Sequence, residues 1–237
     1  MKNISRTVIV LVAAVLVQSC FVFRNTPSTS TPVQQAPVYY MGGGDFSASS
    51  VRNINIAWLD GMVDVIYYAG ATVKFYESSD RSLNSETTMY HRFDGSTLYI
   101  IYGKDGALSR YSSEKKLTVL LPAGTSYRNF ILKANQTSVF VDIDATYANI
   151  STVEGDVRYG TVINPVTLKI KTQSGPIDCI LPPSASFKLV TATQSGKFTS
   201  DFSLKRSGSC YIYGSGYSNV TLDSGSGNVA LIRAESY

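Results

Sequence analysis

Residues 168–177 read LKIKTQSGPI: apolar and polar side chains alternate, a Thr-Gln-Ser-Gly turn follows, and a second apolar run begins after it. Alternation with a period of two is typical of a half-buried β-strand, and adjacent serine and glycine mark a turn. The same arrangement recurs at residues 150–157, 189–198 and 220–229. The glycines that close the four turns are Gly155, Gly175, Gly196 and Gly227. The second half of the chain is therefore predicted to repeat one strand-turn-strand unit.

The spacing of these glycines predicts how the units are arranged. Successive glycines are 20, 21 and 31 residues apart, and the longest interval holds an inserted stretch around residues 206–209. A period of about 20 residues is typical of solenoids, in which each repeat buries its apolar face only by stacking on its neighbours. Glycine suits the corner of each repeat because it adopts positive φ without steric cost. We expect a single-stranded β-helix with rungs of about 20 residues, with a β-sandwich of short hairpins as the alternative.

The region before the repeat is also predicted to be β-structure. Short alternating runs occupy residues 54–58, 63–67, 73–76, 97–101 and 117–121. The chain contains 16 tyrosines and 10 phenylalanines, and aromatic residues favour strands. The polar stretches 77–86 and 103–114 are expected to be loops. Because no long segment after the N-terminal run keeps an apolar period of 3.6 residues, the predicted fold class is all-β.

The N-terminus has the features of an export signal. Lys2 and Arg6 precede ten uninterrupted apolar residues, 8–17, which are followed by Gln18-Ser19-Cys20. The apolar run is about half of the ~20 residues that a membrane-spanning helix needs. The end of the run, Val17-Gln18-Ser19-Cys20, resembles the lipobox of bacterial lipoproteins, which implies cleavage before Cys20 and acylation of that cysteine. We expect a signal peptide at residues 1–19 and a stable membrane anchor on Cys20; the alternative is an uncleaved signal anchor.

A linker is predicted between the anchor and the globular domain. Residues 26–32 are rich in threonine, serine and proline, and three successive glycines occupy positions 42–44. Such segments bury too little apolar surface to offset the entropy of ordering. The predicted organisation is a lipidated flexible tether at residues 20–50 and a β-helical domain at residues 51–237.

Composition and charge exclude some classes of protein. Hydrophobic residues make up 44% of the chain and charged residues 16%, as in globular proteins. The formal net charge is +4, and two of the basic residues belong to the predicted signal peptide. The remaining basic residues are scattered along the sequence, whereas nucleic-acid binding needs a clustered basic face. No nucleic acid or other polyanion is therefore expected as a partner.

Two cysteines remain besides Cys20. Cys179 and Cys210 would close a loop of about 30 residues, and an exported chain lives where disulfides persist. A disulfide between them is one interpretation. The other, which we favour, is that both are buried thiols that act as small apolar side chains.

The sequence lacks the usual constellations of catalysis and metal binding. His91 is the only histidine, so histidine-based metal clusters and Ser-His or Cys-His catalysis are not expected, and we predict no metal and no cofactor. His91 itself is expected on the surface of a strand. Asp142 and Asp144 are two residues apart, which on a strand places two carboxylates on one face ~6.6–7 Å apart, near the separation in inverting glycosidases. A solvated strand has the same alternation, so no catalytic residue is assigned.

Tyrosines are a further candidate surface. Outward positions are predicted for Tyr99, Tyr102, Tyr111, Tyr147, Tyr159, Tyr211, Tyr213 and Tyr217. Stacked rungs would align some of them into an aromatic strip suited to sugar rings or to a protein surface. The alternative for each is cross-strand pairing within a sheet. Trp58 is expected in the core or at an end of the domain.

The repeat resembles that of a known family. The tracts at residues 172–177, 193–198 and 225–229 are similar to the Thr-x-Ser-Gly-x-Ile/Val repeats of the putative-adhesin domains of bacterial envelope proteins. The resemblance spans about residues 50–237 and is most regular after Phe130. It implies a β-helix-like scaffold without an enzymatic activity to carry over, and the lipid anchor and tether are similar to those of family lipoproteins of the Bacteroides group.

These observations lead to one functional prediction with two alternatives. We expect a lipid-anchored, non-enzymatic binding or structural module of the cell envelope, adhesin-like, on an outer-membrane lipoprotein that faces the periplasm or the cell surface. Its partners would be the membrane, through the anchor, and a glycan or an envelope protein. The alternatives are an enzyme acting on polysaccharide, either a glycoside hydrolase or a lyase, and a scaffold or sensor for another envelope protein.

Overall fold

The computed structural model describes residues 37–104 and 115–235. The predicted signal peptide, Cys20 and most of the predicted tether lie outside these residues. The chain from Pro37 onward forms one compact unit. Within the described residues the secondary structure is β-strand without an α-helix, so the all-β prediction is confirmed. No helix of the described part is long and apolar enough to cross a membrane.

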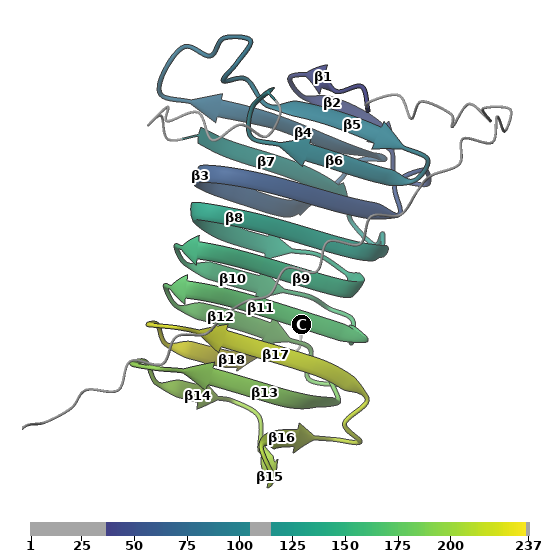
Figure 1. The fold of residues 1–237 in the computed structure, drawn as a ribbon. Helices are drawn as coiled ribbons and strands as arrows, with labels where there is room; N and C mark the ends of the chain where they lie inside the picture. Colours follow the sequence, from purple (N-terminus) through teal and green to yellow (C-terminus); the bar gives the residue numbers. More distant parts are fainter. Residues whose placement is uncertain (1–36, 105–114, 236–237) are drawn as a thin grey trace, which may run out of the picture. The chain divides into compact units, whose positions relative to one another are not determined.

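The described residues form eighteen strands (Figure 1). Their bounds are β1 Tyr40–Met41, β2 Gly44–Ser47, β3 Asn53–Tyr68, β4 Thr72–Ser79, β5 Tyr90–Asp94, β6 Thr97–Ile101, β7 Lys115–Pro122, β8 Tyr127–Asp142, β9 Ala145–Glu154, β10 Val157–Gly160, β11 Thr167–Ser174, β12 Ile177–Leu181, β13 Phe187–Thr193, β14 Phe198–Ser200, β15 Lys205–Ser207, β16 Cys210–Tyr213, β17 Ser218–Ser224 and β18 Val229–Arg233. The predicted loop at residues 77–86 begins later than expected, because β4 extends to Ser79.

The strands pair side by side into two stacks. The first stack has the order β1, β5, β6, β3, β8, β9, β11, β17, β13, β16, β15. The second has the order β2, β4, β7, β3, β8, β10, β12, β18, β14. The long strands β3 and β8 belong to both, because their first halves pair in one stack and their second halves in the other. One strand from each stack, with the corner between them, is called a rung below.

The repeat places like residues on top of one another. In the first stack Ile170 of β11 pairs with Ile150 of β9 and with Leu222 of β17. In the second stack Ile177 of β12 pairs with Val157 and Val229. All of these side chains are buried between the stacks. The alternation read from the sequence therefore places one apolar ladder on each inner face, and burial of these ladders stabilises the domain.

The four corner glycines also stack, at the turn between the two strands of a rung. A Cβ on Gly175 would collide with the carbonyl oxygen of Gly155, one on Gly227 with that of Gly175, and one on Gly196 with that of Gly227. Of the four corner glycines, only Gly155 (φ 120°) and Gly175 (φ 135°) have positive φ. The requirement shared by all four is close approach of neighbouring backbones, so positive φ explains two of the glycines and not the other two.

A threonine or serine three residues before each glycine donates a hydrogen bond to a backbone carbonyl at the corner. Thr172 Oγ1 donates to the carbonyl of Ser174 at 3.1 Å, and Ser224 Oγ donates to the carbonyl of Gly175 at 2.9 Å. Thr193 Oγ1 donates to the carbonyl of Gly227 at 2.8 Å. Thr172 and Ser224 are buried, where an unpaired carbonyl would be unfavourable. The threonine and the glycine of the Thr-x-Ser-Gly motif are thus explained by the corner.

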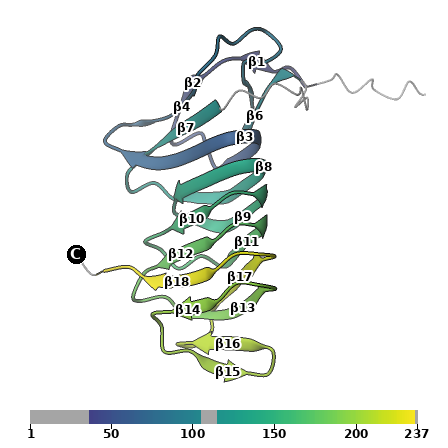
Figure 2. The same ribbon diagram turned by 90° about the vertical axis from the view of Figure 1, so that its left-hand side faces the viewer.

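The rungs are not stacked in the order of the chain. The last rung, β17 and β18, lies between the rung of β11 and β12 and the rung of β13 and β14 (Figures 1 and 2). In the same way β3 lies between β8 and the pair β6 and β7. The long 31-residue glycine interval holds the hairpin of β15 and β16, from whose end the chain returns into the stack.

Antiparallel strands close both ends of the parallel stacks. At one end β5 pairs with β6 and β4 with β7, and at the other β16 pairs with β13. The tether prediction is wrong for residues 40–47, which form β1 and β2 at the first end. The Phe46 ring stacks on Phe93 at 4.8 Å, and a Cβ on Gly43 would collide with the carbonyl oxygen of Phe75. Gly43, one of the three glycines that suggested flexibility, instead allows close packing of the backbone.

Candidate binding face

The outward side chains of the first stack form three rows in register across seven strands. The first row is Thr97, Asn53, Asn129, Tyr147, Thr167, Asn219 and Lys188. The second row is Tyr99, Asn55, Ile131, Asn149, Lys169, Thr221 and Val190. The third row is Ile101, Ala57, Lys133, Ser151, Lys171, Asp223 and Ala192. These 21 residues are called the first face, and most of them are polar.

Side-chain amides bond to one another along the first row. Asn129 Nδ2 donates to Asn53 Oδ1 at 2.7 Å, and Asn53 Nδ2 donates to Thr97 Oγ1 at 3.2 Å. The next residue of the row, Tyr147, is 43% exposed. Bonds between neighbouring rungs hold these groups in fixed positions, which lowers the entropy lost when a ligand binds them.

The first face carries positive charge that the linear sequence does not reveal. Lys133, Lys169 and Lys188 are exposed, and none of them has an ion-pair partner among the described residues. Lys171 pairs with Asp223 at 3.0 Å on the same face. The expectation that the basic residues share no common face is therefore wrong, because residues far apart in sequence are brought together by the stacking of rungs.

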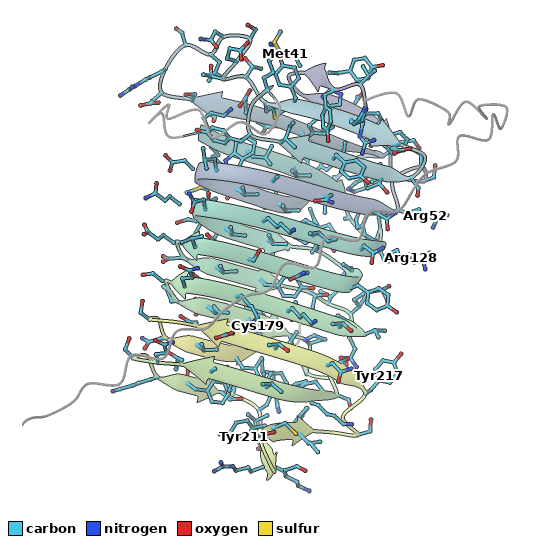
Figure 3. The ribbon with its side chains drawn as sticks, viewed as in Figure 1. Met41, Arg52, Arg128, Cys179, Tyr211 and Tyr217 are labelled. Carbon is cyan, nitrogen blue, oxygen red and sulfur yellow. The ribbon has the colours of Figure 1, made fainter. Side chains whose placement is uncertain are left out.

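Two arginines extend this charge at one edge of the face. Arg52 precedes β3 and Arg128 is the second residue of β8, and the backbone N–H of Arg128 donates to the carbonyl of Arg52 at 2.8 Å. Both side chains are exposed and lie one above the other (Figure 3). A polar hollow of about 410 Å³ lies beside them, lined by Arg52, Asn53, Ser96, Ser126, Tyr127, Arg128 and Thr146. Two guanidinium groups with no described carboxylate in an ion pair with them favour an anion here.

The outer surface of the second stack has a different character. Lys116 is paired with Asp64, and Arg158 pairs across the strands with Asp178, so charges of both signs alternate there. A groove of about 650 Å³ lies at its edge, lined by Ile66, Tyr67, Asp142, Arg158, Gly160, Thr161, Val162, Ile180, Asp201, Ile232, Arg233, Ala234 and Glu235. Val162 is 73% exposed. This second groove is mixed in charge and partly apolar, unlike the first face.

The two carboxylates considered for catalysis do not share a face. Asp142 ends β8 and is exposed, whereas Asp144 lies beyond the strand and is buried. An Asp144 carboxylate oxygen accepts from Thr161 Oγ1 at 2.8 Å and from the backbone N–H of Val162 at 2.9 Å. The strand geometry assumed for the pair fails because the strand stops at Asp142. Asp144 instead satisfies the polar groups of the turn after β10.

His91 is a core residue, contrary to the prediction. Its ring is buried among aromatic side chains, with T-shaped contacts to Phe75 at 5.0 Å and to Phe46 at 6.0 Å. Nδ1 lies 2.8 Å from the carbonyl of Gly42. The described residues include no group of three His, Cys, Asp or Glu side chains that could hold a metal ion. Trp58 is buried as expected.

The tyrosines do not form a strip on the described surface. Tyr102 and Tyr159 are buried, which contradicts their predicted outward positions. The Arg92 guanidinium covers the Tyr99 ring at 4.2 Å, while Tyr147 and Tyr217 are well exposed.

The remaining predicted tyrosines add no exposed ring to the described surface. Tyr211 and Tyr213 are half buried in β16, and Tyr111 lies outside the described residues. Burial raises the pKa of Tyr159, so its hydroxyl stays neutral.

Cys179 and Cys210 are both free in the structure, which contains no disulfide bond between them. Cys179 is buried in β12, and burial raises the pKa of its thiol. Cys210 is only partly buried in β16, where its Sγ donates to the carbonyl of Ser207 at 3.1 Å. The description as a buried thiol therefore fits Cys179 alone.

Sequence reasoning missed a buried ion pair between Lys115 and Glu77. Lys115 Nζ lies 2.6 Å from Glu77 Oε2 and donates to the carbonyls of Thr87 and Tyr102, both at 2.6 Å. The lysine is fully buried, with Nζ 4.1 Å from the centre of the Tyr102 ring. Burial lowers the pKa of Lys115, while the adjacent carboxylate opposes this effect. All donors of the ammonium group are occupied, so the pair is structural.

Comparisons with known proteins give a fold relationship. No family model and no curated protein matches the chain. A crystal structure of a "putative cell adhesion protein" from Clostridium sporogenes superposes with a TM-score of 0.64 at 17% identity, covering 84% of this chain and 100% of that one. A "putative adhesin" from Bacteroides fragilis gives a TM-score of 0.34 at 12% identity, covering 83% of this chain and 98% of that one. The Clostridium structure shares the fold of this chain.

Proposed function

We propose that this protein is a non-enzymatic, adhesin-like binding module of the cell envelope and that its first face is the contact surface. The observation that carries the proposal is the three in-register rows of amide, hydroxyl and basic side chains on one outer face. Such a surface offers many aligned polar groups to an extended partner. The fold relative named as a cell adhesion protein supports this proposal.

The architecture that we infer is a β-solenoid with two strands per rung. Parallel in-register pairing through both stacks supports it, as do the stacked corner glycines. A hairpin-built sandwich would pair sequential strands antiparallel, and antiparallel pairs occur here at the two ends. A solenoid displays a continuous outer surface for contact with a partner.

The location that we propose is the outer membrane, with the domain anchored through lipid on Cys20 after removal of residues 1–19. The basic start, the short apolar run and Val17-Gln18-Ser19-Cys20 support it. Labelled palmitate tests this directly in cells. The parent chain is expected to incorporate label and to fractionate with membranes, and Cys20→Ser to do neither. Equal labelling and membrane association of the variant would overturn the anchor.

A glycan array probed with the full-length chain in detergent tests the binding function. We expect retention on extended glycans, without release of reducing ends during prolonged incubation. Release of reducing ends that is lost in Asp142→Asn would favour the enzyme alternative. An absence of glycan binding, together with crosslinking to one envelope protein, would favour the scaffold or sensor alternative. Either result would overturn the proposal.

A further inference from the structure

We propose that the first face binds an acidic polysaccharide whose carboxylates recur on about every second sugar. This inference rests on the proposed binding function and names the ligand class of the same face. It follows from three features of the described residues: the cations without an ion-pair partner, their spacing along the stack, and the mainly uncharged hydrogen-bonding groups on the strands between them.

The charge of the first face calls for an anionic partner. Of its four lysines, only Lys171 has an acidic partner, Asp223. Lys133, Lys169 and Lys188 are exposed and without an ion-pair partner among the described residues. Surface cations of one sign on one face raise the local concentration of anions and steer their approach. The second stack, where ion pairs and opposite charges alternate, offers no such field.

The spacing of the cations indicates the repeat of the partner. Lys133 lies on β8, Lys169 on β11 and Lys188 on β13, and one strand separates each from the next: β9 and then β17. Adjacent strands are about 4.8 Å apart, so successive charged strands are about 9.6 Å apart. A pyranose ring with its glycosidic oxygen extends a chain by roughly one strand spacing. A carboxylate on alternate sugars would therefore meet each charged strand.

The strands between the lysines present mainly uncharged polar groups, which suit sugar hydroxyls. Strand β9 presents Tyr147, Asn149 and Ser151, and β17 presents Asn219, Thr221 and Asp223, whose charge is paired with Lys171. Amide and hydroxyl groups both donate and accept hydrogen bonds, as sugar hydroxyls do. The exposed Tyr147 ring adds an aromatic surface against which a sugar ring can pack.

The hollow beside Arg52 and Arg128 would hold a further carboxylate at the edge of the same face. Both guanidinium groups are exposed beside this cavity of about 410 Å³. Asn53 joins it to the first row, because Asn53 lines the hollow and accepts from Asn129 Nδ2. Planar guanidinium groups bind carboxylates through paired hydrogen bonds.

Nucleic acid fits this face less well. A nucleic-acid strand carries one phosphate about every 3.4 Å. The strands that carry the lysines recur at about 9.6 Å, and the lysines themselves are farther apart because each lies one row from the next. Stacking of bases needs several exposed aromatic rings, and Tyr147 is the exposed aromatic residue on the described first face. The experiment must therefore distinguish binding of a nucleic acid from binding of a carboxylate-bearing polysaccharide.

Binding of fluorescent hyaluronan oligosaccharides, which carry a carboxylate on alternate sugars, tests the inference with the full-length chain in detergent. The face variant carries Lys133→Gln, Lys169→Gln and Lys188→Gln. A matched control carries Lys74→Gln, Arg158→Gln and Lys197→Gln, three exposed basic residues away from the first face. We expect roughly tenfold weaker binding by the face variant and less than a twofold change in the control, because each exposed charge contact is small but three are lost.

Competition separates the ligand classes. Neutral dextran and single-stranded poly-dT are expected to compete poorly, and binding is expected to weaken as salt is raised. Equal losses in both variants, or stronger binding of poly-dT, would overturn the inference. Binding of neutral glycans with no preference for the acidic one would overturn it and leave the proposed binding function standing. An absence of binding to any glycan would overturn both.

Discussion

At the scale of single residues, side chains serve the backbone of neighbouring rungs as much as the core. The corner glycines leave room for a backbone carbonyl of the neighbouring rung. The threonine or serine three residues before each glycine donates a hydrogen bond to a corner carbonyl. Both requirements come from the distance between stacked strands. The motif is thus visible in the sequence because the same geometric problem recurs at each corner, and it carries no information about a ligand.

Gly175→Ala tests the corner. The added Cβ would meet the carbonyl oxygen of Gly155 at a residue with φ of 135°. We expect the free energy of unfolding to fall by roughly 2–4 kcal/mol, from backbone strain and the collision together. Denaturant unfolding measures the loss.

Gly208→Ala is the matched control for this change. Gly208 also has positive φ, 60°, but nothing lies within 4 Å of an added Cβ. Its loss should be about 1 kcal/mol. Equal losses at Gly175 and Gly208 would show that the stacked backbone contributes nothing to the glycine requirement.

The two cysteines are predicted to differ in reactivity. Iodoacetamide should modify Cys210 in the folded protein and reach Cys179 only after denaturation, because the Cys179 thiol is buried and its pKa is raised. Mass spectrometry without reductant checks both sites. A chain that takes up no alkylating reagent at either site even when denatured would contain the disulfide and contradict the structure.

At the scale of the strands, the sequence predicts what each rung is but not which rungs are neighbours. Alternation predicted β11 and β12 and their inner residues Ile170 and Ile177, because burial on one face leaves a period of two. The position of β17 between β11 and β13 leaves no such mark. The basic face was missed for the same reason: the separation of Lys133 and Lys188 in the sequence does not reveal their separation in the stack.

Phe46→Ala tests the conclusion that β2 belongs to the folded unit. The Phe46 ring stacks with Phe75 and Phe93. Its removal is expected to lower the free energy of unfolding by about 1–3 kcal/mol, because the ring is partly buried. Thermal unfolding followed by circular dichroism measures the change.

The control for Phe46 lies in the same strand. Asp45 is exposed, and Asp45→Ala should leave the stability within about 0.5 kcal/mol of the parent. If Phe46→Ala were equally neutral, residues 44–47 would act as part of the tether after all.

At the scale of the whole folded unit, stability depends on rungs that the chain completes last. Strands β17 and β18 fill the space between two earlier rungs and pair on both sides. The strands of this rung pair only with the strands of the two neighbouring rungs, so loss of the rung separates the parts on either side. A terminal rung at the end of a stack would have a smaller effect.

A stop codon after Gly216 tests this arrangement, because it removes both β17 and β18. The truncated chain is expected to lose its cooperative thermal transition, since the strands on either side of the gap lose their partners. A stop codon after Arg233 is the control: β18 stays whole and the transition should remain. Cooperative unfolding of the shorter chain near the parent temperature would show that the interior position of the last rung is unimportant.

The interleaved order of the rungs also sets when folding can finish. Strand β3 needs β8 on one side and β6 with β7 on the other, and the rung of β11 needs a partner that lies some fifty residues further on, since Ile170 pairs with Leu222. A polypeptide that emerges from a ribosome or a channel with its N-terminus first cannot add its rungs one after another in the order of the sequence. The complete stack therefore cannot form before the final segment is available, because the rungs on either side of β17 and β18 lack their shared partner until then.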